Sequence, residues 1–420
     1  MKRNIDMKRL LGAAAPFGLM LALSACAQPE SAAPEPAPEI DVAALHDRIL
    51  TLDTHIDIPL TYMTEIDPTA ETDLQVDLPK LTAGKLDSGF WIVYTPQGDL
   101  TDGAYAAAAE IAETRMTAIE ALVKTHSSHF ELAKTVADVR RITGQGKQAV
   151  LVGMENAFPL GLACKTTQEC EDTVQKWSQR GVRYMGITHF GHNQFGDSSN
   201  LNFQRDNGPK WNGLSPAGRD LVNQLNKTGI MVDLSHAGKE TMMQAADLSR
   251  APIIASHSGV KAVADTARNL DDEQLRKLAE VGGVAQMVAL GSYVKLPTAE
   301  QQAARDKLDA EFGDRSTWDQ AKRDLYGERR DVIKAMAPEA SVSNFVDHID
   351  HAVKIAGIDH VGIASDFDGG GGIDGWQDAS ETLEVTRELV ARGYSESDIS
   401  KIWGGNLLRV MEAVEAEAAK

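Results

Sequence analysis

A histidine and an aspartate stand two residues apart in residues 52–57, LDTHID. On a β-strand, residues i and i+2 point to the same side, so His55 and Asp57 can face one point together. A neutral imidazole and a carboxylate that converge in this way suit a divalent metal ion such as zinc. Taken alone, the pair also fits a local hydrogen bond at the end of a strand, so the metal prediction depends on the rest of the chain.

Residues of the same chemistry end other apolar stretches of the chain. They are Glu155, His189, His236, His257 and Asp366. Glu155 closes the apolar run AVLVGM, and a carboxylate there is costly to bury unless it is paired or bound to metal. Taken singly, His236 and His257 are better explained as hydrogen-bonded core histidines. Their recurrence at the ends of apolar stretches makes one shared site the sharper hypothesis.

The apolar stretches alternate with amphipathic segments and predict a barrel. Strands are expected at 49–54, 88–94, 149–155, 182–188, 230–236, 252–257, 283–289 and 360–366. Helices are expected at 103–124, 167–180, 215–228, 238–249, 271–280 and 343–356. Near-continuous apolar runs are typical of parallel strands that are covered on both faces, and eight of them alternating with helices predict a (β/α)8 barrel of the TIM type over residues 41–420. A doubly wound open sheet is the alternative, but no G-x-G-x-x-G follows the first strand.

In such a barrel the carboxyl ends of all strands share the face on which the chemistry takes place. Three imidazoles (His55, His236, His257) and two carboxylates (Asp57, Glu155) exceed the needs of one catalytic zinc, which takes about three protein ligands and a water. A carboxylate that bridged two metals would use all five. The metal pair would then hold a hydroxide and polarise a carbonyl, so the sequence predicts metal-dependent hydrolysis.

Several stretches resemble the membrane (renal) dipeptidase family, zinc peptidases with an amidohydrolase-like barrel. They are DTHID, DLPKL with SGFWIVY, GMEN, GITH, VDLSH, PIIASHSGVKAVADTARN, GIASDFDGG and GGNLLRV, and they span the domain in order. The resemblance implies two Zn²⁺ ions per subunit. His55 and Asp57 would bind one ion, His236 and His257 the other, and Glu155 would bridge them.

The resemblance also implies roles for three further residues. His189 corresponds to a substrate-binding histidine, Arg268 to an arginine near the substrate, and Asp366 to the catalytic aspartate. The Arg268 guanidinium can grip a peptide's terminal carboxylate, although without the resemblance a surface arginine that caps a helix would be the default interpretation. Asp366 ends a buried strand and is not needed as a ligand, which leaves it for proton transfer.

The expected function is therefore that of a dinuclear zinc dipeptidase that hydrolyses the amide bond of small dipeptides, including those with a C-terminal D-residue. One alternative is another barrel amidohydrolase or a lactonase, and another is a non-catalytic lipoprotein that binds metal or peptide. The resemblance further implies a homodimer. The formal net charge of -19 argues against nucleic acid as a partner, because so acidic a surface repels phosphates.

The N-terminus is expected to be a targeting segment. In residues 1–25, a basic start and an apolar core at 10–23 lead to LSAC, which predicts a lipoprotein signal peptide cleaved before a lipidated Cys26. Residues 26–40 are rich in Pro, Ala and Glu, and predict a disordered tether. The protein is thus expected to be exported, lipid-anchored and periplasm-facing. Because Ala27 rather than Asp follows Cys26, the outer membrane is the expected location.

Four other segments carry expectations. Cys164 and Cys170 are predicted to form a disulfide in a polar loop, since export favours oxidation. Residues 298–340 are predicted to form a helical excursion beside the active-site face, before the eighth strand. His348 and His351 are predicted to lie on a polar helix face. Residues 395–416 are predicted to close the chain as a helix or helix pair, broken at 404–406.

Overall fold

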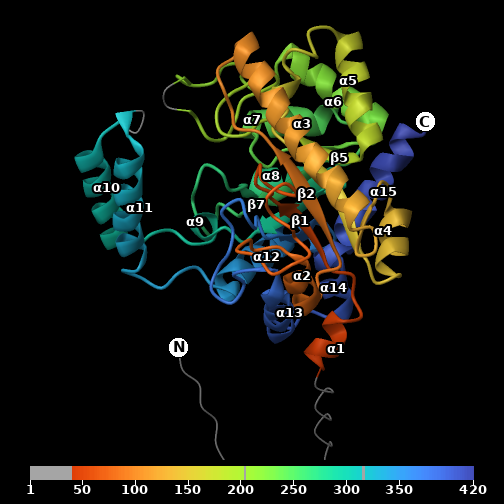
Figure 1. Cartoon of the computed structure of the whole chain (residues 1–420), viewed down its shortest axis with the longest axis vertical. Coiled ribbons are helices and arrows are strands. Elements are labelled where there is room, and N and C mark those ends of the chain that lie inside the picture. The colour runs from red at the N-terminus through yellow and green to blue at the C-terminus, as the bar shows by residue number, and fades with distance from the viewer. Residues whose placement is uncertain (1–39, 203–204, 315–316) are drawn as a thin grey trace, which may run out of the picture. The chain divides into compact units, whose positions relative to one another are not determined.

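The computed structural model describes residues 40–420 apart from 203–204 and 315–316 (Figure 1). The predicted signal peptide, Cys26 and all but the last residue of the predicted tether lie outside the described residues. Among the described residues, no helix is both long and apolar enough to cross a membrane.

Eight parallel strands form a nearly closed barrel, which confirms the predicted (β/α)8 fold. In spatial order they are β1 (Leu52–Ile56), β2 (Ser88–Tyr94), β4 (Gln148–Glu155), β5 (Val182–Gly186), β6 (Met231–Asp233), β7 (Ile254–Ser258), β8 (Val284–Val288) and β9 (Val361–Ala364). The loop after β9 returns to β1, where the Asp57 amide donates to the Phe367 carbonyl at 2.9 Å and the Asp366 amide to the His55 carbonyl at 3.1 Å. This closure brings the ends of the first and last strands together.

The strands are apolar on both faces because each face is covered. In β2, Phe90 and Ile92 pack in the cluster that also holds Tyr184, while the alternating residues Trp91 and Val93 pack in the larger cluster formed with the surrounding helices. Alternate residues point to opposite faces, and both faces are apolar, so the strand sequences are near-continuous apolar runs.

The helices surround the barrel and carry clear start signals. They are α1 (Val42–His46), α2 (Leu78–Gly84), α3 (Asp102–Thr125), α4 (Val136–Thr143), α5 (Thr167–Arg180), α6 (Pro216–Thr228), α7 (Lys239–Leu248), α8 (Asp272–Glu280), α9 (Gly291–Val294), α12 (Val342–Ala356), α13 (Thr382–Ala391), α14 (Glu396–Ser400) and α15 (Asn406–Ala418). The six predicted helices are all present. In α5, for example, Thr166 and Glu169 form a reciprocal capping box that fixes where the helix begins.

Two strand predictions need correction. The short strand β3 (Phe130–Leu132) was not predicted, and it pairs with β4 outside the barrel path. Only its first residue is buried, so its sequence shows no apolar run. Strand β6 is shorter than predicted and ends at Asp233, which leaves His236 in the turn beyond it.

The predicted break in the C-terminal tail is wrong. Between α14 and α15 the backbone continues as a π-helical turn over Lys401–Gly405. A Cβ atom at Gly404 would stand 3.2 Å from the Leu50 carbonyl oxygen and 3.4 Å from the Leu52 Cβ. The glycine therefore allows the helix to pack closely against the start of β1, and it does not end the helix.

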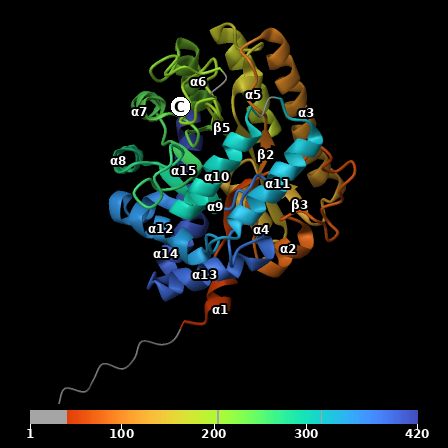
Figure 2. The same ribbon diagram turned by 90° about the vertical axis from the view of Figure 1, so that its left-hand side faces the viewer.

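The excursion between β8 and β9 is helical, as predicted. Helices α10 (Ala299–Phe312) and α11 (Gln320–Lys334) form a hairpin that projects from the barrel (Figures 1 and 2). The hairpin has an apolar cluster of its own, formed by Leu308, Phe312, Trp318, Tyr326 and Ile333. It follows directly on α9, so it leaves the barrel beside the carboxyl ends of the strands.

Candidate active site

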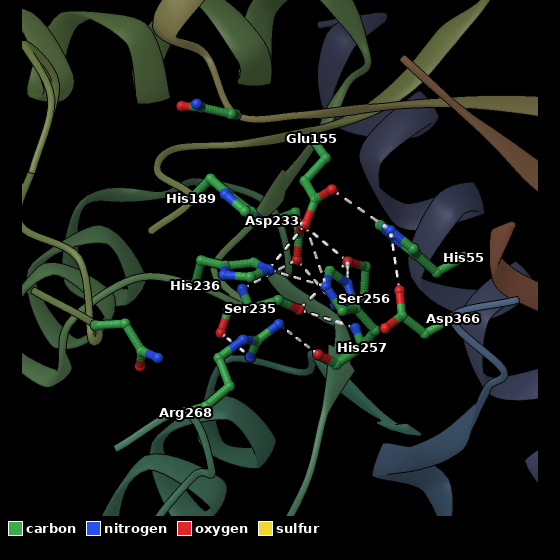
Figure 3. Close-up of polar contacts among 12 residues, drawn as sticks. His55, Glu155, His189, Asp233, Ser235, His236, Ser256, His257, Arg268 and Asp366 are labelled. Atoms are coloured by element: carbon green, nitrogen blue, oxygen red, sulfur yellow. Dashed lines mark hydrogen bonds and ion pairs between the residues drawn. The ribbon is translucent and has the colours of Figure 1, made fainter. Parts of the chain in front are cut away.

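The residues predicted from the strand ends lie together in the structure (Figure 3). His55, Glu155 and His257 lie within the last residues of β1, β4 and β7. The others stand in the loops that directly follow β1, β5, β6 and β9; they are Asp57, His189, His236 and Asp366. Closure of the barrel is what makes these distant segments neighbours.

Glu155 lies at the centre of the cluster. Its Oε1 is 2.8 Å from Nε2 of His236, 3.3 Å from Nε2 of His257 and 3.6 Å from Nε2 of His189. Its Oε2 is 3.6 Å from Nε2 of His55. Oε1 thus faces three imidazoles and Oε2 a fourth, so both carboxylate oxygens are available for a bridging role.

His55 also faces two other carboxylates. Its Nε2 lies 3.5 Å from Oδ2 of Asp57 and 3.7 Å from Oδ1 of Asp366. Donors around a tetrahedral zinc ion, with bonds of about 2.1 Å, lie about 3.4 Å apart, so these spacings suit a metal ion.

Three sets of side chains could each hold a metal ion, because the donor atoms within each set lie within 4.8 Å of one another. They are His55, Glu155 and His257; Glu155, His189 and His236; and His55, Asp57 and Asp366. His257 stands with His55 in one of these sets, and Asp366 is itself a possible ligand. The expected set of Glu155, His236 and His257 is also close, with separations of 2.8, 3.3 and 3.0 Å. Asp366 is therefore placed for ligation as well as for proton transfer.

Unsatisfied polar atoms at the centre also fit a cation. Nε2 of His55 and Oδ1 of Asp57 are buried and have no hydrogen-bond partner among the described residues. Nε2 of His236 and Nε2 of His257 face each other at 3.0 Å. Leaving such atoms buried and unpaired is costly, and a metal ion would satisfy them.

Hydrogen bonds behind two of the histidines turn their Nε2 lone pairs toward this centre. Ser256 Oγ donates to Asp233 Oδ2 at 2.8 Å and so accepts from Nδ1 of His257 at 2.9 Å. Likewise Tyr184 donates to the Thr54 carbonyl, and its oxygen lies 2.9 Å from Nδ1 of His55. A proton fixed on Nδ1 leaves Nε2 bare, which is the tautomer that binds metal.

Burial and nearby positive charge keep two imidazoles of the cluster, those of His236 and His257, in the neutral form. Burial lowers the pKa of His236 and of His257 well below the usual range, and the positive charge of Arg268 lowers both further. Burial alone would lower the pKa of His55 too, but the Glu155 and Asp57 carboxylates raise it well above its usual value. A cation at this centre would replace that proton.

Asp366 has the strongest reason to hold a proton. Burial raises its pKa to about 8; His55 opposes the rise, while the negative charges of Asp57 and Glu155 add to it. Its backbone is also unusual, with φ at 61°. A non-glycine residue in the left-handed region costs free energy, and active sites are among the places where such residues cluster.

A glycine lets the loop after β9 approach the cluster. A Cβ atom at Gly369 would stand 2.1 Å from Oδ2 of Asp57 and 2.8 Å from Oδ1 of Asp366. Any other residue would displace one of these carboxylates. The GGGG run in the sequence is the signal for this close approach.

Arg268 is buried rather than on the surface, so its interpretation as a surface helix cap is wrong. The side chain is 1% exposed. Its Nη1 donates to the Ser235 carbonyl and to Ser258 Oγ, and its Nη2 donates to the His257 carbonyl at 2.7 Å. The guanidinium thus braces the segments that carry His236 and His257. A role for Arg268 in substrate binding stays a prediction.

A cavity of about 410 Å³ opens over the cluster. Predicted residues in its wall are Asp57, Glu155, His189, His236, His257 and Asp366. Tyr94, Arg115, Phe190 and Tyr293 also line it, and sequence reasoning missed them. Tyr94 ends β2, so the strand-end argument could have found it. Arg115 lies in the middle of α3, where no such signal exists.

The structure also tests the predictions for His348 and for the two cysteines Cys164 and Cys170. His348 is not on a polar helix face; it is 1% exposed, accepts from the Val260 amide at 2.8 Å and donates to the Val294 carbonyl at 2.9 Å. It is buried because these two backbone groups need partners. Cys164 and Cys170 are joined by a disulfide, with Cys170 in the first turn of α5 rather than in a loop.

The chain is similar to known dipeptidases over most of its length. A model of the membrane dipeptidase family (peptidase family M19) matches residues 40–420. Dipeptidase tcpJ of Claviceps purpurea is 30% identical over 357 residues, which cover 84% of this chain and 72% of that protein. The crystal structure of the probable dipeptidase PvdM from Pseudomonas aeruginosa is 35% identical with a TM-score of 0.82, covering 90% of this chain and 98% of that one.

A further solved structure shares the fold at lower identity. It is a metallopeptidase from Rhodobacter sphaeroides liganded with a phosphinate mimic of the dipeptide L-Ala-D-Ala, with 24% identity and a TM-score of 0.68, covering 87% of this chain and 99% of that one. The resemblance seen in the sequence is confirmed by the family match. The chain belongs to the membrane dipeptidase family of metallopeptidases.

Proposed function

We propose that this protein is a zinc-dependent dipeptidase that holds two zinc ions and hydrolyses the amide bond of small dipeptides, including those with a C-terminal D-residue. The observation that carries the proposal is the position of Glu155, whose Oε1 faces His236 and His257 and whose Oε2 faces His55. Zinc bound there would polarise the substrate carbonyl and lower the pKa of a water molecule.

The proposed ligands are those that the sequence predicts. His55 and Asp57 would hold one ion, His236 and His257 the other, and Glu155 would bridge the two. The unpaired Nε2 of His55 and Oδ1 of Asp57 support the first half of this assignment. The facing Nε2 atoms of His236 and His257 support the second.

Three other residues would act on the substrate. Asp366, whose Oδ1 lies 3.7 Å from Nε2 of His55, would take up a proton during attack and return it to the leaving amine. His189 lines the cavity and would donate a hydrogen bond to the substrate carbonyl oxygen. Arg268 would bind the C-terminal carboxylate through its Nε–H, which has no partner among the described residues.

A substrate panel tests this function against its alternatives. The zinc-loaded protein is expected to hydrolyse L,L- and L,D-dipeptides much faster than N-acyl amino acids or lactones. Hydrolysis of lactones or N-acyl amino acids alone would favour another barrel hydrolase. Metal binding without hydrolysis of any of these compounds would favour a binding protein.

The proposed location is the periplasmic face of the outer membrane, with lipidated Cys26 as the anchor, and the proposed assembly is a homodimer. The support for the anchor is the LSAC sequence after the apolar segment at 10–23. Cys26→Ala protein is expected to leave the membrane fraction that retains the wild type. Recovery of both proteins in the same membrane fraction would contradict the anchor.

A further inference from the structure

Arg115 on α3 lines the active-site cavity and has no carboxylate partner among the described residues. Its Nε donates to the Ile58 carbonyl at 3.0 Å, and its Nη1 donates to the Tyr94 carbonyl at 2.6 Å. Its Nη2 makes no hydrogen bond within the described part of the chain. The guanidinium is thus held in place by two backbone carbonyls, while Nη2 is left for a ligand.

A guanidinium in this position is costly without an anion. Burial lowers the pKa of Arg115, which reflects the loss of water around its charge. Arg180 has carboxylate partners in Glu113 and Glu120. Arg183 and Arg409, like Arg115, donate to backbone carbonyls, but unlike Arg115 they do not line the cavity.

Arg115 is half-buried, and the carboxylates that act on its charge, Asp57 and Glu155, are the ones proposed to bind metal. A carboxylate on the ligand would therefore supply the direct partner that Arg115 lacks.

The position of Arg115 relative to Arg268 determines which part of a bound dipeptide Arg115 can contact. Arg115 is fixed to the ends of β1 and β2, whereas Arg268 is fixed behind the ends of β6 and β7. In the strand order of the barrel, these two pairs lie on opposite sides. A dipeptide whose C-terminal carboxylate lies toward Arg268 therefore directs its N-terminal residue toward Arg115.

Tyr94 links Arg115 to the reacting centre. The Arg115 Cζ lies 5.2 Å from the centre of the Tyr94 ring, and the His189 ring lies 5.0 Å from it on edge. One amino-acid residue spans about 3.5 Å, and an acidic side chain adds a similar reach. A side-chain carboxylate on the N-terminal residue can thus approach Arg115 while the peptide bond lies near His189.

We propose that Arg115 forms a subsite for the side-chain carboxylate of the substrate's N-terminal residue, so that the enzyme prefers dipeptides beginning with Glu or Asp. This inference rests on the proposed dipeptidase function and on Arg268 as the partner of the C-terminal carboxylate. The planar fork of Arg115 suits a carboxylate better than a neutral amide, because its N–H groups donate charge-assisted hydrogen bonds.

Two isosteric substrate pairs test the subsite. The wild-type enzyme is expected to show a kcat/KM for L-Glu-L-Ala about 10- to 100-fold above that for L-Gln-L-Ala, the span of one charge-assisted contact. No such preference is expected between L-Ala-L-Glu and L-Ala-L-Gln. Arg115→Met should lose the preference at the N-terminal position, so that its kcat/KM for L-Glu-L-Ala falls to that for L-Gln-L-Ala. Arg48→Met is the matched control, because Arg48 is exposed and pairs with Glu396.

Several results would overturn the subsite. Equal kcat/KM values of the wild type for L-Glu-L-Ala and L-Gln-L-Ala would do so without any variant, and so would a preference confined to the C-terminal position. An equal loss on both substrates in Arg115→Met and in Arg115→Lys would make Arg115 only a brace for β1 and β2. Good hydrolysis of neutral dipeptides in these cases would leave the proposed function intact, whereas no hydrolysis of any dipeptide would overturn both.

Discussion

The hydroxyl oxygen of Ser256 lies 2.9 Å from Nδ1 of His257. The same hydroxyl donates to Asp233, whose other contacts are the backbone amides of Ser235 and Ser256. The three side chains form a chain from a buried carboxylate through a hydroxyl to an imidazole. Such partners fix both the orientation and the tautomer of a metal-binding histidine.

Ser256→Ala should therefore weaken metal binding although it removes no proposed ligand. The loss of the hydroxyl leaves His257 Nδ1 without its acceptor, and we expect a metal affinity about 10- to 100-fold lower. Competition with a chelator measures this affinity directly. Ser178→Ala is the matched control, since Ser178 is buried but donates to the Thr228 carbonyl away from the site. Equal metal affinity in the Ser256→Ala and wild-type proteins would remove Ser256 from the site.

Asp366→Asn separates proton transfer from metal binding. Asparagine keeps the size of the side chain but cannot accept the proton, so kcat should fall about 10²- to 10⁴-fold with near-full zinc occupancy. Metal analysis and turnover on the same sample measure both quantities. Loss of zinc in this variant would instead make Asp366 a ligand, as its 3.7 Å distance from His55 Nε2 allows.

Arg268→Ala should reduce kcat/KM more for free dipeptides than for dipeptide amides, which lack the terminal carboxylate. The variant also removes the brace on the Ser235 and His257 carbonyls, so some loss on both substrates is expected. The ratio of the two kcat/KM values isolates the carboxylate contact. If the loss is the same for acids and amides, Arg268 has a structural role alone.

His348→Ala should keep metal and activity but lose about 2–3 kcal/mol of stability, because two buried backbone groups lose their partner. Burial lowers the pKa of His348 in the folded protein. The unfolded chain therefore binds the proton first, and the stability from this residue is present above about pH 6.5 and is lost as the pH falls below it. Urea unfolding at pH 7.5 and 5.5 should show a smaller pH effect in His348→Ala than in the wild type. An equal pH effect in both proteins would contradict this role.

The sequence predicts the barrel and most of the cluster because both depend on patterns that are local in the chain. An apolar run that ends in Glu155 or His257 indicates a buried strand and a polar strand end at once. The orientation of His348 and the burial of Arg268 depend on backbone groups far along the chain, so no local pattern contains them. The same holds for Arg115, whose place in the cavity follows from how α3 packs on β2 and from its hydrogen bond to the Ile58 carbonyl.

The central claim is that a metal centre built on Glu155 and the strand-end histidines performs dipeptide hydrolysis. The most direct test is metal content and L,L-dipeptide hydrolysis measured on one sample, before and after chelation and after return of zinc, with His236→Ala beside the wild type. We predict two zinc ions per wild-type chain, loss of activity on chelation, recovery with zinc, and loss of metal and activity together in His236→Ala. Undiminished hydrolysis by the stripped protein, or equal metal content in His236→Ala and the wild type, would contradict the account.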